Sequence, residues 1–256
     1  MVAKTKFQLG ASTLFAWKDG KSPKLFEEIV HRRDLLWEIV DEDELAVTED
    51  DALKLRTIGI DHQVSFSVHV PFLRKDILSS NFVLRSSSIA SIKRSLEMAN
   101  KYEARFAIIH PGYRNDGISL EEAAEILNDL FDYSHELGIT PLLENLTKGA
   151  AFYRPEDIKL FQKLLFRPNF ALDVGHANIE DNLEGFLRTN RAFSYFHIHD
   201  NLGHRDEHLP LGRGSINWGA FFSEVMRSDP SRPLVIENFS LHDLEISLDF
   251  ALKMLS

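Results

Sequence analysis

The stretch NFALDVGHAN, residues 169–178, has a form that recurs through this chain. A short apolar run ends on a carboxylate, Asp173, and His176 follows three residues later. Runs that are apolar throughout are typical of parallel β-strands, which are covered on both faces. Gly175 lets the backbone turn, so we expect Asp173 and His176 to face inward together at the end of a strand. The alternative for this motif alone is an Asp that caps a helix beside a surface His.

Runs of the same kind alternate with amphipathic stretches along the whole chain. The expected strands are residues 7–13, 36–40, 64–69, 106–110, 140–144, 169–173, 193–199 and 234–237. The polar residues that end them recur at intervals of roughly 30 residues, about the length of one strand-plus-helix unit. Eight parallel strands are the number that a closed barrel needs. The sequence therefore predicts an α/β fold, a (β/α)8 TIM barrel, as a single domain over residues 1–256.

Several local signals predict where helices and loops lie between these strands. Apolar residues recur at helical spacing in 88–102 and 119–137, and Ser119 with Glu122 predicts a capping box. Gly59 and Gly138 are expected to end helices. The connections 71–82 and 200–216 are long, so we expect them to overhang the barrel mouth and shape a substrate site.

Composition excludes some chemistries and disfavours certain partners. The 256 residues include no cysteine, so disulfides and thiolate ligands are excluded. A formal charge of −10 disfavours broad attraction to nucleic acid or anionic membrane, although bound metal ions would add local positive charge. No stretch has the form of a signal peptide or approaches the ~18 apolar residues of a membrane helix. We therefore expect a cytoplasmic enzyme without membrane contact.

Imidazole and carboxylate groups at strand ends point to metal ions. Side chains at the carboxyl ends of barrel strands converge on one mouth, and this donor mixture suits zinc, manganese, iron or cobalt. Glu144 and Glu237 end their runs in the similar contexts LLEN and VIEN, with a salt bridge to Arg or Lys as the alternative. His69 and His110 end two other runs, where a hydrogen-bonded core histidine fits either residue alone nearly as well.

Two pairs of residues have a spacing of two. His197 and His199 should point to the same side of their strand. Only one of them need bind metal, which leaves the other free to orient a ligand or contact substrate. Asp206 and His208 repeat this spacing in a loop, where charged residues are usually solvated.

Taken in this order, the motifs resemble those of the xylose isomerase-like barrel superfamily, which includes the endonuclease IV branch (AP endonuclease family 2). The four-ligand core shared by that superfamily matches Glu144, Asp173, His197 and Glu237. In the endonuclease branch an Asp follows the strand-seven histidine after three residues, which favours His197, with Asp200, over His199. The resemblance to the nine zinc ligands of that branch gives the set His69, His110, Glu144, Asp173, His176, His197, Asp206, His208 and Glu237.

The resemblance implies two alternative activities. The first is a sugar or sugar-phosphate isomerase or epimerase, with one Zn²⁺ or Mn²⁺ and with Glu144 and Glu237 as its acid/base pair. Its substrate would be a sugar or polyol, contacted by His199, Asp200, Trp17 and Phe72.

The second is a zinc-dependent endonuclease acting on abasic DNA with two or three ions. Loops poor in Arg and Lys favour the small sugar over nucleic acid. A barrel that has lost activity is a third alternative, and the oligomeric state stays open.

Overall fold

The computed structural model describes residues 8–18, 26–42, 46–114, 117–227, 229 and 231–256, without the side chains of 17 and 18. Eight strands in this part of the chain form a closed parallel barrel in sequence order, which confirms the predicted (β/α)8 fold. The strands are β1 (Leu9–Ser12), β2 (Leu36–Val40), β3 (Ser65–His69), β4 (Phe106–Ile109), β5 (Thr140–Glu144), β6 (Phe170–Asp173), β7 (Phe193–Ile198) and β8 (Leu234–Ile236).

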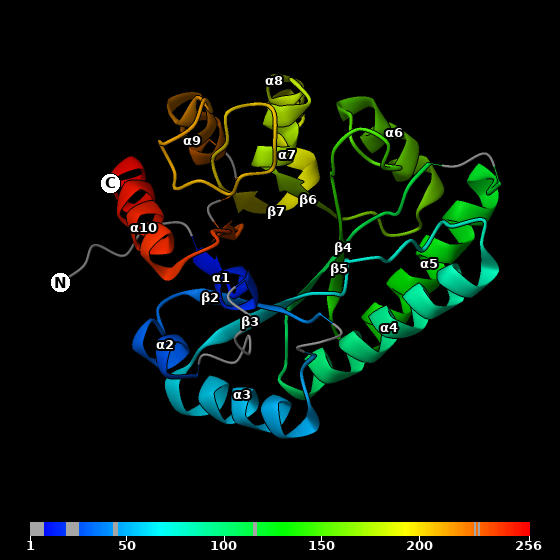
Figure 1. The fold of residues 1–256 in the computed structure, drawn as a ribbon, viewed down its shortest axis with the longest axis horizontal. Helices are drawn as coiled ribbons and strands as arrows, with labels where there is room; N and C mark the ends of the chain where they lie inside the picture. The colour runs from blue at the N-terminus through cyan, green and yellow to red at the C-terminus, as the bar shows by residue number, and fades with distance from the viewer. Residues whose placement is uncertain (1–7, 19–25, 43–45, 115–116, 228, 230) are drawn as a thin grey trace.

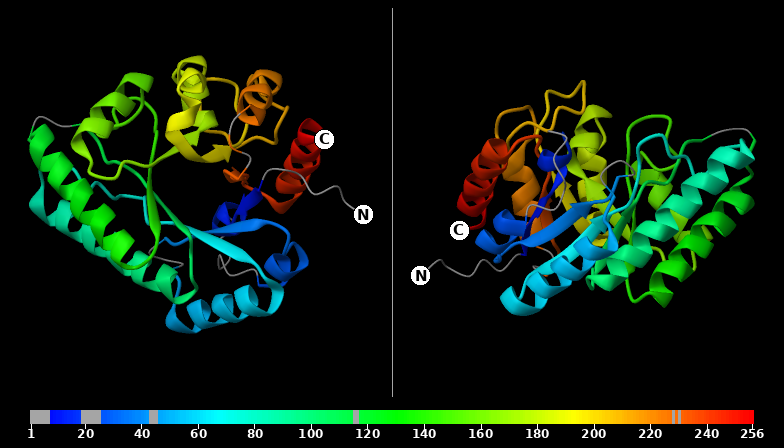
Figure 2. Two further views of the ribbon diagram at one scale, coloured as in Figure 1. Left: turned by 180° about the vertical axis from the view of Figure 1, so that it is seen from behind. Right: turned by 60° about the horizontal axis from the view of Figure 1, so that its bottom comes forward.

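Helices surround the barrel on its outside (Figure 1, Figure 2). Their bounds are α1 (Leu14–Lys18), α2 (Phe26–His31), α3 (Glu49–His62), α4 (Phe82–Lys101), α5 (Leu120–Glu136), α6 (Pro155–Leu164), α7 (Val174–Ile179), α8 (Leu183–Arg188), the 3-10 turn η2 (Asn190–Ala192), α9 (Trp218–Met226) and α10 (Leu241–Leu255). Helices α3, α4 and α5 lie together on one side, and α7 to α10 lie around the strands from β6 to β8. No helix among the described residues is long and apolar enough to cross a membrane.

The inside of the barrel contains an apolar layer below a polar one. The apolar layer is a buried cluster of Leu36, Ile108, Leu142, Ala171, Tyr195 and Val235. Two residues further along the same strands come Glu38, His110, Glu144, Asp173, His197 and Glu237. Because side chains alternate along a strand, residues two apart point the same way, so the second set lies above the first, toward the carboxyl ends of the strands.

The local signals for helix ends are confirmed at one helix and wrong at another. Ser119 caps α5 by accepting a hydrogen bond from Glu122 N at 3.1 Å, which is one of the two bonds of the predicted capping box, and Gly138 follows that helix with φ +76°. Gly59, in contrast, lies inside α3, which continues to His62 and ends on Gln63 in the left-handed conformation. A Cβ on Gly59 would lie 3.2 Å from the Phe66 ring, so this glycine serves close packing of helix on strand rather than helix termination.

Both long connections lie at the carboxyl ends of their strands, as expected, and a buried carboxylate organises each. Glu42 Oε1 accepts the backbone N–H groups of Phe72 and Leu73, at 2.6 and 3.1 Å, in the loop after β3. Asp200 accepts from Gly212 N and Trp218 Nε1, at 2.9 and 2.8 Å, in the loop after β7. These bonds fix the two loops that frame the barrel mouth.

Candidate metal centre

The predicted four-residue core converges on one nitrogen atom, Nδ1 of His197. His197 is fully buried on β7, and its Nδ1 lies 2.6 Å from Glu144 Oε1. The same atom lies 3.8 Å from Glu237 Oε2 and 4.0 Å from Asp173 Oδ2. These residues lie at the carboxyl ends of four consecutive strands, β5 to β8, or one residue away, so closure of the barrel brings them together.

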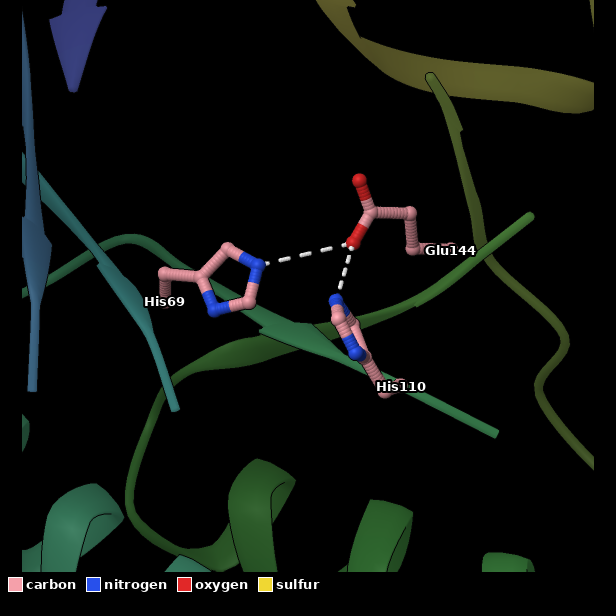
Figure 3. A group of neighbouring side chains, drawn as sticks. All are labelled: His69, His110 and Glu144. Atoms are coloured by element: carbon pink, nitrogen blue, oxygen red, sulfur yellow. Dashed lines mark ion pairs between the residues drawn. The ribbon is translucent and has the colours of Figure 1, made fainter. Parts of the chain in front are cut away.

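Glu144 also joins this core to the histidines of β3 and β4. Its second oxygen, Oε2, lies 2.9 Å from His110 Nε2 and 3.5 Å from His69 Nε2 (Figure 3). The two imidazole rings meet edge to face, with centroids 4.9 Å apart. The carboxylate of Glu144 therefore lies between His197 on one side and His69 with His110 on the other.

The loop after β7 completes a second group around Asp206. Asp206 Oδ2 lies 3.1 Å from His208 Nε2 and 3.4 Å from His176 Nε2, while its Oδ1 lies 3.6 Å from His199 Nε2. His199 in turn lies 3.3 Å from Asp173 Oδ2, which connects this group to the core. The structure thus brings all nine predicted ligand positions together, including the loop pair whose spacing alone was a weak signal.

Burial and charge set the acidities of the two glutamates apart. Burial alone would raise the pKa of Glu144, but His197, His110 and His69 hold that pKa well below its usual value. Burial raises the pKa of Glu237 to about 7, and the carboxylates of Glu38 and Glu144 contribute to the rise. Glu144 is therefore the more readily ionised of the pair.

The donor chemistry fits a transition-metal ion. Within the described part of the chain, no Lys or Arg side chain lines this pocket, and the ion pairs of Glu144 and Glu237 are to histidines only. Buried carboxylates need a compensating positive charge, which bound cations provide. Glu144, Asp173 and His197 offer ligand atoms within 4.8 Å of one another, as do His69, His110 and Glu144. Mixed carboxylate and imidazole sets of this kind suit zinc, manganese, iron or cobalt.

Comparison with known proteins identifies the family. The sequence matches the xylose isomerase-like TIM barrel family over residues 29–254. The chain belongs to this family. It is 28% identical over 247 residues to the uncharacterized protein MJ1614 of Methanocaldococcus jannaschii, covering 94% of this chain and 97% of the relative.

Two solved structures have the same fold. A D-tagatose 3-epimerase-like protein superposes with a TM-score of 0.87 at 24% identity, over 97% of each chain. A D-psicose 3-epimerase crystallised in the presence of D-fructose gives a TM-score of 0.71 at 17% identity, over 94% of this chain and 90% of the other. One of these structures is of a sugar epimerase and the other is of an epimerase-like protein, and identities of 17% and 24% show a shared fold alone.

One further carboxylate in this site, Glu38, was missed in the sequence. It is fully buried on β2, and its Oε2 lies 2.9 Å from His197 Nε2. It stands in the middle of the run LWEIV rather than at its end, so a search for residues that end strands passes over it. The signal that could have found it is a lone charge in an otherwise apolar strand, in phase with the inward-facing Leu36.

A pocket of about 150 Å³ opens above these residues. Phe72, one of the predicted substrate residues, lines it, together with Phe239, which the sequence reading did not single out. His69 and His110 contact the Phe72 ring, with centroids 4.9 and 5.1 Å away. The pocket therefore combines an aromatic wall with a floor of imidazoles and carboxylates.

The other predicted substrate residues have different positions. His199 is fully buried and stacks on His208, with ring centroids 3.9 Å apart. Asp200 directs its carboxylate to its own loop, as described above. Trp17 belongs to α1, but its side chain is outside the described residues.

Proposed function

We propose that this protein is a divalent-metal-dependent isomerase or epimerase of a small sugar. The observation that carries the proposal is the convergence of Glu144, Asp173 and Glu237 on Nδ1 of His197, all within 4.0 Å, beneath a pocket with an aromatic wall. The sugar epimerases among the structural relatives support the same class of reaction.

The four core residues would hold the ion. When bound, a divalent ion acts as a Lewis acid toward a carbonyl oxygen of the substrate. Glu144 and Glu237 then serve as the acid/base pair, one removing a proton from the carbon next to the carbonyl and the other returning a proton from the opposite face.

The pocket favours a sugar without a phosphate group. At about 150 Å³ it is small compared with the ~300–1,000 Å³ typical of ligand sites, so a monosaccharide is the expected size class. Among its described lining residues none is Lys or Arg, the side chains that usually pair with phosphate. Phe72 and Phe239 offer apolar faces to the C–H faces of a sugar ring or chain.

Proton transfer can be tested directly on the purified protein. The metal-free protein is loaded separately with Mn²⁺, Co²⁺ or Zn²⁺ and incubated with a panel of ketoses in D₂O. We expect metal-dependent incorporation of one deuterium into a ketose and its product, and loss of this exchange in Glu237→Gln. Exchange that proceeds equally well after metal removal, or in Glu237→Gln, would contradict the proposal.

A second candidate is a zinc-dependent phosphodiesterase acting on abasic DNA. The observation in its favour is that His69, His110, His176, Asp206 and His208 all lie at the same centre, which exceeds what one ion needs. Two or three tightly bound zinc ions per chain, with cleavage of an abasic duplex, would support this candidate over the first.

A further inference from the structure

Glu38 belongs to the barrel interior and its side chain is directed at the metal-binding core. It is paired in register with Ser12 on β1 and Ser67 on β3, and it is fully buried. A buried carboxylate is costly unless it is paired and hydrogen-bonded. The buried Glu38 carboxylate therefore requires hydrogen-bond partners, and one of these partners is the predicted metal ligand His197.

A single oxygen of Glu38 accepts two hydrogen bonds. Tyr195 donates its hydroxyl to Glu38 Oε2 at 2.8 Å, and His197 Nε2 lies 2.9 Å from the same oxygen. The Tyr195 oxygen is in turn 2.8 Å from Ser67 Oγ, so Ser67 is the donor in that contact. This chain of bonds fixes the direction of the Glu38 carboxylate from below.

The contact with Glu38 leaves only one ring nitrogen of His197 to face the predicted ligands. With Nε2 bound to Glu38, the opposite nitrogen, Nδ1, faces Glu144, Glu237 and Asp173. His199, the other candidate on β7, instead lies against Asp173 and Asp206. The geometry thus distinguishes two histidines that sequence spacing could not.

We propose that Glu38 is the positioning residue of the metal centre: it holds His197 through Nε2 and thereby presents Nδ1 to the metal ion. The inference rests on the metal centre of the proposed function and adds to it a residue outside the predicted ligand set. Carboxylates that bind the second nitrogen of a ligand histidine fix its ring orientation and tautomer, and their loss typically lowers metal affinity about 10–100-fold.

The test compares metal binding by the full-length wild type, Glu38→Gln, and a control. The amide keeps the size of the side chain but removes the charge and can donate to Nε2, which favours the wrong tautomer. Asp51→Asn is the matched control, because Asp51 is also buried but caps α3 on the outside of the barrel. Affinity for Co²⁺ is measured by chelator competition, the ligand field by the visible absorption of bound Co²⁺, and folding by circular dichroism.

We expect Glu38→Gln to bind Co²⁺ about 10–100-fold more weakly with a changed absorption spectrum, and Asp51→Asn to match wild type in both. Tyr195→Phe is measured alongside, since it keeps the ring and removes one bond to the same oxygen; a loss of about 2–10-fold is expected. The positioning role alone would be overturned if a folded Glu38→Gln had wild-type affinity and spectrum. If Glu38→Gln does not fold, the same result in Tyr195→Phe would overturn it. Failure of the wild type to bind any divalent ion would instead overturn the proposed function as well.

Discussion

Glu144 bridges His197 and His110: one carboxylate oxygen lies 2.6 Å from His197 Nδ1 and the other 2.9 Å from His110 Nε2. Glu144 therefore belongs to two groups of potential metal ligands. One group contains His69 and His110, and the other contains Asp173 and His197. Substitution of this residue should disturb the whole centre rather than a single contact.

Glu144→Gln is expected to remove metal binding at the core and to lower turnover at least ~100-fold, because both a ligand and a proton-transfer group are lost. The measurement is turnover together with metal content after dialysis. Glu97→Gln on α4 is the matched control, since Glu97 contacts the exposed Tyr133 hydroxyl on the outside of the barrel. Equal losses in both variants would show that the effect of Glu144 is not local.

Asp206→Asn tests whether the loop group holds an ion that the reaction needs. Asp206 contacts His176, His199 and His208 but has no ion pair with His197. We expect the tightly bound core ion to remain, with turnover reduced less than in Glu144→Gln. A fall from two or three ions per chain to one, measured by elemental mass spectrometry, would speak for the phosphodiesterase.

Phe72→Ala is expected to weaken substrate binding more than catalysis. The ring packs against His69 and His110 at the pocket wall, so KM should rise about 10-fold while kcat changes little. Phe166→Ala is the control, because Phe166 is 79% exposed and lies away from the pocket. A loss confined to kcat would argue that Phe72 acts in the chemical step.

Gly175→Ala should damage the centre through sterics alone. A Cβ at this position would clash with His199 Cε1, so the buried ring of His199 must shift, which disturbs its contacts with Asp173 and His208. We expect a lower melting temperature and a loss of activity. The control is Gly138→Ala, where nothing lies within 4 Å of the added Cβ and only backbone strain at φ +76° is introduced. Retention of full activity in Gly175→Ala would contradict the position assigned to His199.

The strands and most of the site could be predicted because their signals are local. Each buried strand is a short apolar run, and a polar residue that ends such a run, such as Glu144 or Asp173, stands out in the sequence. Glu38 could not be found in this way, because it stands in the middle of its apolar run. Its contact with His197 arises only when the closed barrel brings β2 and β7 face to face across the interior. Gly59 was misread since its sequence context is the same whether a helix ends there or packs closely against Phe66.

The contacts made by the loop side chains were also harder to predict than the positions of the loops. Asp200 and Asp206 lie six residues apart in one connection, yet one carboxylate organises the loop and the other turns into the pocket. Phe239 follows the VIEN motif and reaches His208, with ring centroids 4.5 Å apart. Such contacts arise from long-range packing, which no spacing rule along the chain encodes.

The most direct test of the central claim is the number of divalent ions bound per chain. Protein purified without chelator and without a metal-affinity tag is measured by elemental mass spectrometry, beside Glu144→Gln. We predict about one tightly bound transition-metal ion per wild-type chain and a large loss of metal in the variant. A wild-type chain that holds no divalent ion, even after loading with Mn²⁺, Co²⁺ or Zn²⁺, would contradict it.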